Sequence, residues 1–332
     1  MSEHKLKKVL RCSVVSTALT VVAGCSSVAD YKQPITDLNA SIDSSVATVI
    51  KIDSEITESQ NRRWRELIGE SEAFLVPSEN SCAAGSKSCS LVVIASGGDT
   101  EKSFPAKSMM PKAIIALSGL RQYADNLKAI VDADTAASVA TSANAALASA
   151  AKIEAEIAKA NNPDAQISST IKAYSPPITA SISWLVSQYI ERQKVKALAT
   201  ATERAQPVIE DLAVYYETAA AVASSLKDAD ALDEFVEAQG VFDNVASKSN
   251  SAINEYLRAV KEYDTALKAS SSKPMQKFLE AHTALNGALN GSDEVSLADA
   301  IAAIKEFKRH SKDFKESVDE YVSVAKGQQE IN

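Results

Sequence analysis

Apolar residues recur at alternating spacings of three and four along most of this chain, a heptad pattern typical of helices that pack side by side. The pattern first runs through Ile35, Leu38, Ile42, Val49, Ile52 and Ile56, with Ser45 at the missing position. Pro34 precedes it, and proline suits the first turn of a helix. A helix is therefore predicted from Pro34 to about Gly69.

A second seam follows Pro111, and no glycine occurs between Gly119 and Gly240. Its members are Leu117, Leu120, Ala124, Leu127 and Val131, followed by Ala143, Ala146, Ala150, Ile153 and Ile157. Between the two halves the phase slips by steps of four, from Thr135 to Val139. Because such a slip unwinds a supercoil locally without ending the helix, the sequence predicts one rod of about fifty residues, ~75 Å long.

The third seam holds its phase from Val195 to Leu226 straight through Pro207, so the sequence predicts a kinked helix there rather than a chain reversal. An acidic cluster follows and is interpreted as a turn plus the acidic first turn of a new helix. The cluster comprises Asp228, Asp230, Asp233 and Glu234. The seam of the new helix comprises Phe242, Ala246, Ser249, Ile253, Tyr256, Val260, Tyr263 and Leu267.

Two more helices are predicted, from Met275 to Leu289 and from Ser296 to Gly327, before a frayed tail at 328–332. The predicted fold class is all-α, an elongated antiparallel bundle of about six long coiled-coil-like helices over residues 34–327. The chain has 55 alanines while aromatic residues make up 5% of it. This composition favours helices that pack closely through small side chains.

Residues 71–104 interrupt the helical pattern. Two short β-prone runs, Ala73–Pro77 and Leu91–Ile94, flank Cys82 and Cys89. A small hairpin insertion stapled by a Cys82–Cys89 disulfide is predicted, since an isolated pair of cysteines in an oxidising compartment favours a local disulfide. A zinc site is the alternative, but two thiols without a nearby histidine supply only half of a ligand set.

The first 24 residues carry a basic n-region and an apolar stretch, Val14 to Val22, which is too short to span a bilayer. The stretch ends in Val22-Ala23-Gly24-Cys25, which resembles the lipobox of bacterial lipoprotein precursors. The resemblance implies cleavage between Gly24 and Cys25 and a diacylglycerol on the Cys25 sulfur. An ordinary signal peptide with a chance cysteine is the alternative.

The same resemblance implies to which membrane the lipidated protein is sent. Ser26 and Ser27 after the lipidated cysteine match the outer-membrane choice, because aspartate there often marks retention at the inner membrane. Residues 25–33 are then a lipidated polar tether, and most of the chain is expected in the periplasm. No later segment approaches 18 consecutive apolar residues, so no other membrane crossing is expected.

Charge narrows the range of partners. Residues 1–24 hold four basic residues and one acidic residue, so the mature chain has 31 Lys+Arg and 42 Asp+Glu, a balance of −11. An acidic chain is a poor candidate for binding nucleic acid or anionic lipid surfaces. The expected partners are the membrane, through the lipid on Cys25, and an envelope protein or a second copy of the chain.

Three groups of side chains are candidates for binding sites. Glu306, His310 and Asp313 share one helical face, but the basic residues among them favour a salt-bridged, solvated surface over a metal site. His282 lies in a seam and is interpreted as a buried neutral histidine rather than a ligand or pH switch. The acidic cluster lacks the alternating ligands and turn glycine of calcium loops, so helix capping is favoured there.

Two groups are candidates for contact with a partner. Arg62, Arg63 and Trp64 combine charge with an indole, as contact hot spots do, although compensation of the helix dipole would also explain them. The apolar run of the hairpin, Leu91, Val92, Val93 and Ile94, is the second candidate, with packing against the bundle as the alternative.

No nucleophile motif, glycine-rich phosphate loop or metal signature occurs, so neither catalysis nor a cofactor is expected. The sequence favours a non-enzymatic helical scaffold or adaptor for a protein partner in the cell envelope. Two alternatives remain open: a membrane-active or pore-forming helical protein, and a lipoprotein that binds a small apolar ligand between its helices.

Overall fold

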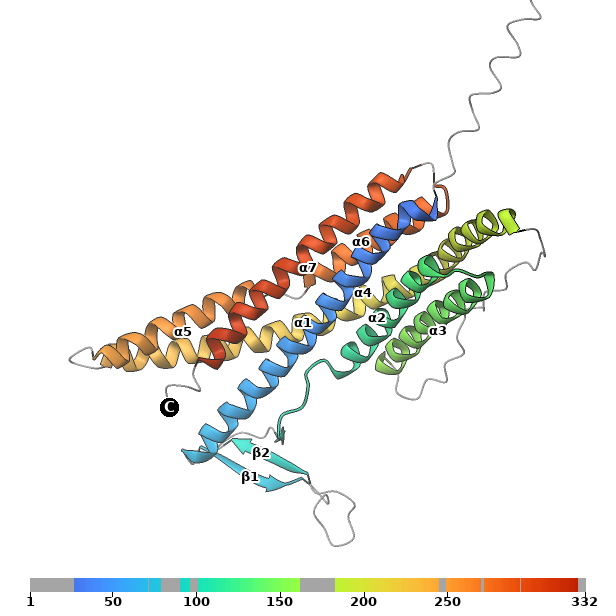
Figure 1. Cartoon of the computed structure of the whole chain (residues 1–332). Coiled ribbons are helices and arrows are strands. Elements are labelled where there is room, and N and C mark those ends of the chain that lie inside the picture. Colours follow the sequence, from blue (N-terminus) through green and yellow to red (C-terminus); the bar gives the residue numbers. More distant parts are fainter. Residues whose placement is uncertain are drawn as a thin grey trace, which may run out of the picture.

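The computed structural model describes residues 27–70, 72–78, 90–95, 101–161, 183–244, 249–269, 272–292 and 294–327. Within these ranges the chain is mostly helical and forms an elongated bundle (Figure 1), which confirms the all-α class. The elements are α1 (Val28–Gly69), β1 (Ala73–Pro77), β2 (Leu91–Ala95), β3 (Glu101–Phe104), α2 (Pro111–Asp132), α3 (Ala136–Asn161), α4 (Ser183–Asn244), α5 (Asn250–Lys268), α6 (Ser272–Leu289) and α7 (Leu297–Lys326).

The first helix begins earlier than predicted. Ser27 is its N-cap: the Ser27 hydroxyl accepts a hydrogen bond from the Ala29 N–H, and the Asp30 carboxylate accepts one from the Ser27 N–H. This capping box satisfies the free N–H groups of the first turn. Much of the predicted tether 25–33 is therefore helix, and Pro34 lies inside α1 rather than at its start.

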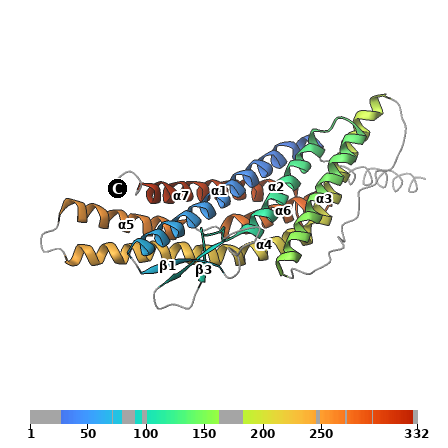
Figure 2. The same cartoon turned by 90° about the horizontal axis from the view of Figure 1, so that it is seen from below.

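The prediction of a single rod from Pro111 to about Ala160 is wrong. The chain leaves the helix at Ala133, whose backbone is extended (φ −61°, ψ 142°), and α3 begins three residues later. Thr135 starts the new helix, since its hydroxyl accepts a hydrogen bond from the Ser138 N–H at 3.0 Å. α2 and α3 then lie side by side (Figures 1 and 2). The phase slip in the sequence thus marks a chain reversal.

The third long helix continues through Pro207, as predicted, but it does not end at the acidic cluster. α4 extends to Asn244 without a break, and α5 starts only after Ser249, whose hydroxyl caps the Ala252 N–H. No glycine or proline lies between Pro207 and Gly240 to stop the helix. The predicted turn at Asp228 is therefore wrong.

The helices are not uniformly antiparallel. α1 and α7 run in the same direction, because Asp37 pairs with Lys308 near the start of both helices while Lys51 pairs with Asp319 farther along both. α3 and α4 also share a direction, whereas α2, α5 and α6 run the opposite way (Figure 1). The bundle is thus of mixed direction, which corrects the antiparallel prediction.

Most predicted seams form the core. Residues of the first seam (Ile35, Leu38, Ile42), both halves of the second and the seam of α6 are buried. The seam of α5 is different. Val260 and Leu267 are 37% and 52% exposed, while the buried residues of α5 are Ala252, Ala259, Glu262, Thr265 and Ala266. α5 therefore turns a small and polar face to the bundle, and its apolar heptad points partly outward.

The interruption at 71–104 forms a three-stranded antiparallel sheet in the order β1-β2-β3. The predicted hairpin partners do pair, with Phe74 opposite Ile94. The third strand was not predicted, because Glu101–Phe104 is short and largely polar. Cys82 and Cys89 lie outside the described residues, so the disulfide staple is not supported and stays a prediction. Gly24 and Cys25 also lie outside them.

Candidate functional site at the far end of the bundle

The two ends of the bundle differ in character. α1 starts at Val28 and its 42 residues extend ~60 Å. At its other end lie the sheet and the tip where α4 meets α5 (Figure 1), and we call this region the far end. The predicted contact residues Arg62–Trp64 and Leu91–Ile94 belong to this region. A contact surface for a partner is therefore expected at the far end.

Arg62 and Arg63 act within the fold. Both terminal nitrogens of Arg62 lie 3.5 Å from Glu55, which is buried in the same helix. Arg63 joins α1 to α4, with Nη1 at 2.6 Å from Asp233 and 3.5 Å from Asp230. Neither arginine lies in the last turn of α1, so the interpretation based on the helix dipole fails too. Trp64 is half-buried, and among the described residues it forms no ion pair of this kind.

Carboxylates and arginines cluster where α1, α4 and α5 meet. Arg258 Nη1 lies 2.9 Å from Glu262 and 3.8 Å from Glu234. Burial, together with the nearby Glu234 charge, raises the pKa of Glu262 to about 7. Burial also raises the pKa of Asp230 to about 6, against the opposing effect of Arg63. The acidic residues predicted to form a turn are thus the polar contacts that hold α4 to its neighbours.

A buried lysine closes this cluster. Lys227 donates hydrogen bonds to the Ala266 carbonyl of α5 and to the Asp228 carboxylate, and its ammonium lies 5.7 Å from the centre of the Tyr321 ring. Burial lowers the pKa of Lys227, and the contact with Asp228 opposes that effect. Lys227 therefore ties α4 to α5 and α7 at one level of the bundle.

The sheet presents a different apolar surface from the predicted one. Val92 and Val93 of the central strand are buried, as the packed alternative expects, whereas Leu91 and Ile94 are half-buried and their contact with a partner stays a prediction. The exposed apolar side chains are on the edge strand β1, where Phe74 is 59% exposed and Leu75 is 40% exposed. The sequence pattern alone did not separate the two strands, since both are apolar throughout.

The pair formed by the end of α4 and α5 carries the second apolar surface. We define the arm as residues 226–244 of α4 with α5. Phe235 stacks on Tyr263 with ring centres 5.9 Å apart, and Phe242 stacks on Tyr256 at 4.9 Å. Exposed large apolar residues surround these rings: Leu232, Val236, Val241, Leu257, Val260 and Leu267. The sequence analysis placed two of them, Val260 and Leu267, in a predicted seam and did not single out the other four.

His282 is buried and satisfied by two other helices, as predicted. Its Nε2 lies 2.9 Å from the Tyr123 hydroxyl and its Nδ1 2.7 Å from the Gln206 amide oxygen. The Gln206 nitrogen donates to Glu210, which only accepts, so the amide oxygen faces His282. Nδ1 therefore carries the proton, and Nε2 accepts from Tyr123. Burial lowers the pKa of His282 to about 4, which keeps the ring neutral.

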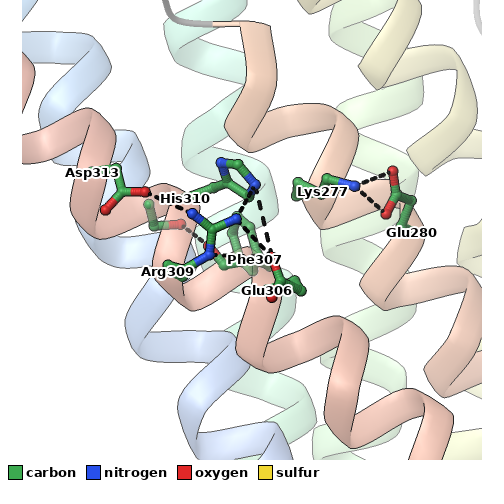
Figure 3. A network of polar contacts seen from close by, with 8 residues as sticks. Lys277, Glu280, Glu306, Phe307, Arg309, His310 and Asp313 are labelled. Carbon is green, nitrogen blue, oxygen red and sulfur yellow. Dashed lines mark hydrogen bonds and ion pairs between the residues drawn. The ribbon is translucent and has the colours of Figure 1, made fainter.

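Glu306, His310 and Asp313 do not converge on one point (Figure 3). Arg309 lies between them, with Nη2 at 2.8 Å from Glu306 and Nη1 at 3.1 Å from Asp313. This is the salt-bridged surface that the sequence favoured. Across the described residues, no group of three or more His, Cys, Asp and Glu side chains is arranged to hold a metal ion.

The cavity at the centre of the described helices is small. A cavity of ≈20 Å³ lies among α1, α2, α4, α6 and α7, lined by apolar residues that include Val46, Leu117 and Phe278. That volume suits about one water molecule and is far below the volume of typical ligand pockets, ~300–1,000 Å³.

None of the helices in the described ranges has the length and apolar character needed to cross a membrane.

The fold and its surfaces define an elongated helical bundle with a small sheet and an apolar arm at one end. Comparisons of the chain with family models, curated proteins and solved structures returned no match in any of the three.

Proposed function

We propose that this chain is a non-enzymatic scaffold or adaptor of the cell envelope, anchored to the outer membrane by lipid on Cys25 and contacting a protein partner at its far end. The observation that supports this proposal is the length of α1, which starts close to Cys25 in the sequence. Helix α1 is capped at Ser27, two residues after Cys25, and extends ~60 Å away from it. Two or three acyl chains at Cys25 would make the attachment effectively permanent.

The packing of the long helices supports this role. α1, α4 and α7 contribute buried apolar residues to one core, and ion pairs such as Lys51–Asp319 and Arg63–Asp233 cross between them at the surface. Exposed apolar residues collect where the sheet and the arm lie, far from the start of α1. A rod with its anchor at one end and most of its exposed large apolar residues at the other suits a protein that holds a partner at a set distance from the membrane.

The test uses the full lipidated protein in its host. A photo-reactive amino acid at Phe74 is expected to give a discrete cross-linked species in the outer-membrane fraction. The same residue at Ile115, which is exposed on α2 away from the far end, serves as the control. Cys25→Ser is expected to abolish both the membrane fractionation and the cross-link. Finding only the monomer from Phe74 would refute the adaptor function.

The alternative of a membrane-active protein has its own test. The Cys25→Ser protein, which cannot be lipidated, is added to liposomes that contain a self-quenched dye. We expect no release of dye. Release that depends on protein concentration would favour the membrane-active function over the adaptor.

A further inference from the structure

The arm carries a heptad seam that no helix of the described chain covers. Tyr256 and Tyr263 of this seam lie at the edge of the contact with α4, and Val260 and Leu267 point outward beyond them. In the other described helices the corresponding seam residues are mostly buried. A stripe at this spacing is the surface that a second amphipathic helix recognises.

Both helices of the arm contribute to one surface. On α4, Leu232 lies three residues before Phe235, and on α5, Val260 lies three residues before Tyr263. Residues three or four apart share a helix face, so the exposed aliphatic side chains flank the stacked rings of Phe235 and Tyr263. The aromatic rings thus form a floor between aliphatic edges, which suits the apolar face of a helix laid along the arm.

The position of the arm leaves this surface accessible. α4 and α5 project together past the ends of α1 and α7, in both views (Figures 1 and 2). Leu257 is 59% exposed and Leu267 52% exposed, on the side of α5 that carries the seam. The buried side of α5 meets the bundle through Glu262 and Ala266. A helix on the outer side would therefore displace nothing from the core.

The charge of the arm indicates what kind of helix would bind there. The arm has nine acidic residues and four basic ones, a balance of −5; the basic residues are Lys227 on α4 and Arg258, Lys261 and Lys268 on α5. Lys227 is buried and already bonded to Asp228 and Ala266. A second copy of this chain would bring the same carboxylates to the interface and be repelled, whereas lysine or arginine beside an apolar face would be attracted.

We propose that the outer face of the arm docks a basic amphipathic helix of the partner protein. This inference rests on the proposed adaptor function and specifies the chemistry of its partner. The helix would lay its apolar stripe over the aromatic floor and place its cations beside the exposed carboxylates of Glu237 and Asp243 on α4. Docking would complete a three-helix unit with α4 and α5.

The test measures binding of two synthetic helical peptides to the purified Cys25→Ser chain by fluorescence anisotropy. Both peptides have about three heptads with leucine at the seam, and they differ only in lysine or glutamate beside it. We expect the lysine peptide to bind at least about tenfold more tightly than the glutamate peptide. The double variant Val260→Asp/Leu267→Asp is expected to weaken the lysine peptide by about tenfold or more. Leu232→Asp on α4 gives an independent second variant.

The control is Ile115→Asp, a substitution at a comparably exposed residue of α2. It is expected to leave binding unchanged, and circular dichroism checks that every variant keeps its helices. Equal binding of both peptides, or unchanged binding by the arm variants, would overturn the inference. So would a dimer in sedimentation that Val260→Asp/Leu267→Asp dissociates, because a second copy would then occupy the arm. Binding of phosphatidylcholine–phosphatidylglycerol vesicles through the same residues would overturn it in favour of a lipid surface.

The two proposals fail separately. If the lysine peptide does not bind but the cross-link from Phe74 persists in cells, the docking inference falls and the adaptor function stands. If the peptide binds but cells yield only monomer from Phe74, the adaptor function falls.

Discussion

Replacing Glu262 by glutamine should make the protein more stable at neutral pH and leave it unchanged at low pH. Glu262 is almost fully buried, and its carboxylate has Arg258 at 2.9 Å but also Glu234 nearby. Its pKa rises from 4.5 to about 7, first because of burial and then because of the Glu234 charge. Since the folded-state pKa is the higher one, the unfolded chain loses this proton first. The contribution of neutral Glu262 to the stability of the protein is therefore fully present below about pH 4.5 and decreases as the pH rises toward 7.

The size of the effect follows from that interval. One pH unit corresponds to 1.36 kcal/mol, so 4.5 to about 7 gives an upper limit of ~3 kcal/mol. Glutamine removes this penalty because it stays neutral. The pKa of Glu262 already includes the attraction of Arg258, which lowers it, so the loss of that ion pair is not subtracted again. The net stabilisation by Glu262→Gln should be up to ~3 kcal/mol at pH 7.5 and close to zero at pH 4.5.

Urea unfolding followed by circular dichroism at several pH values between 4.5 and 7.5 measures this difference. Glu255→Gln, at an exposed position of the same helix, is the matched control and should show no such trend. A difference between wild type and Glu262→Gln that stays constant with pH would refute the argument. A loss of stability that grows toward pH 7.5 would show that the Arg258 pair outweighs burial.

Three further predictions concern the bundle itself, all measured by urea or thermal unfolding. Gly119→Ala should destabilise the protein by ~1–2 kcal/mol, because the new Cβ would lie 2.8 Å from the Ile153 side chain. Gly240→Ala, whose Cβ would lie in open space, should stabilise the protein by up to ~1 kcal/mol. Equal effects of the two substitutions would refute the close α2–α3 contact. Asp53→Ala should cost ~2–3 kcal/mol and Asp53→Asn less, since this carboxylate accepts two backbone N–H groups at the start of α2. His282→Phe should lower the free energy of unfolding by ~2–3 kcal/mol. Because the folded-state pKa of His282 is lowered to about 4, the wild type should lose stability as the pH falls from 6.5 to about 4, and the variant should not. A difference between the two proteins that does not change with pH would contradict the buried, neutral state of His282.

The sequence predicted which residues form the core better than how the helices connect. The seams of α1 and α6 are buried almost residue for residue, because a heptad requires only that some helix lies opposite. The same seam fits one long helix or two helices folded back on each other, so the reversal at Ala133 was missed. Ala133 is neither glycine nor proline, and only the capping pair Thr135 and Ser138 signals the new start.

The candidate contact surfaces were harder to predict, since a partner-facing seam has the same pattern as a core seam. Nothing in Val260 or Leu267 distinguishes them from the buried leucines of α6. The roles of Arg62 and Arg63 were missed for a different reason. Asp230, which pairs with Arg63, lies 167 residues farther along the chain, and helical periodicity contains no information about such pairs.

Polar contacts of this kind set the register of a bundle whose seams are rich in alanine. Alanine faces are alike from turn to turn, so they bring helices close together without favouring one axial alignment over another. Buried polar groups do favour one, because a slip by one turn would leave each of them unpaired in the core. Lys227 with the Ala266 carbonyl, and His282 between Tyr123 and Gln206, mark two separate levels along α4. A helix fixed at two levels cannot slide, and its free end can therefore project as an arm in one defined direction.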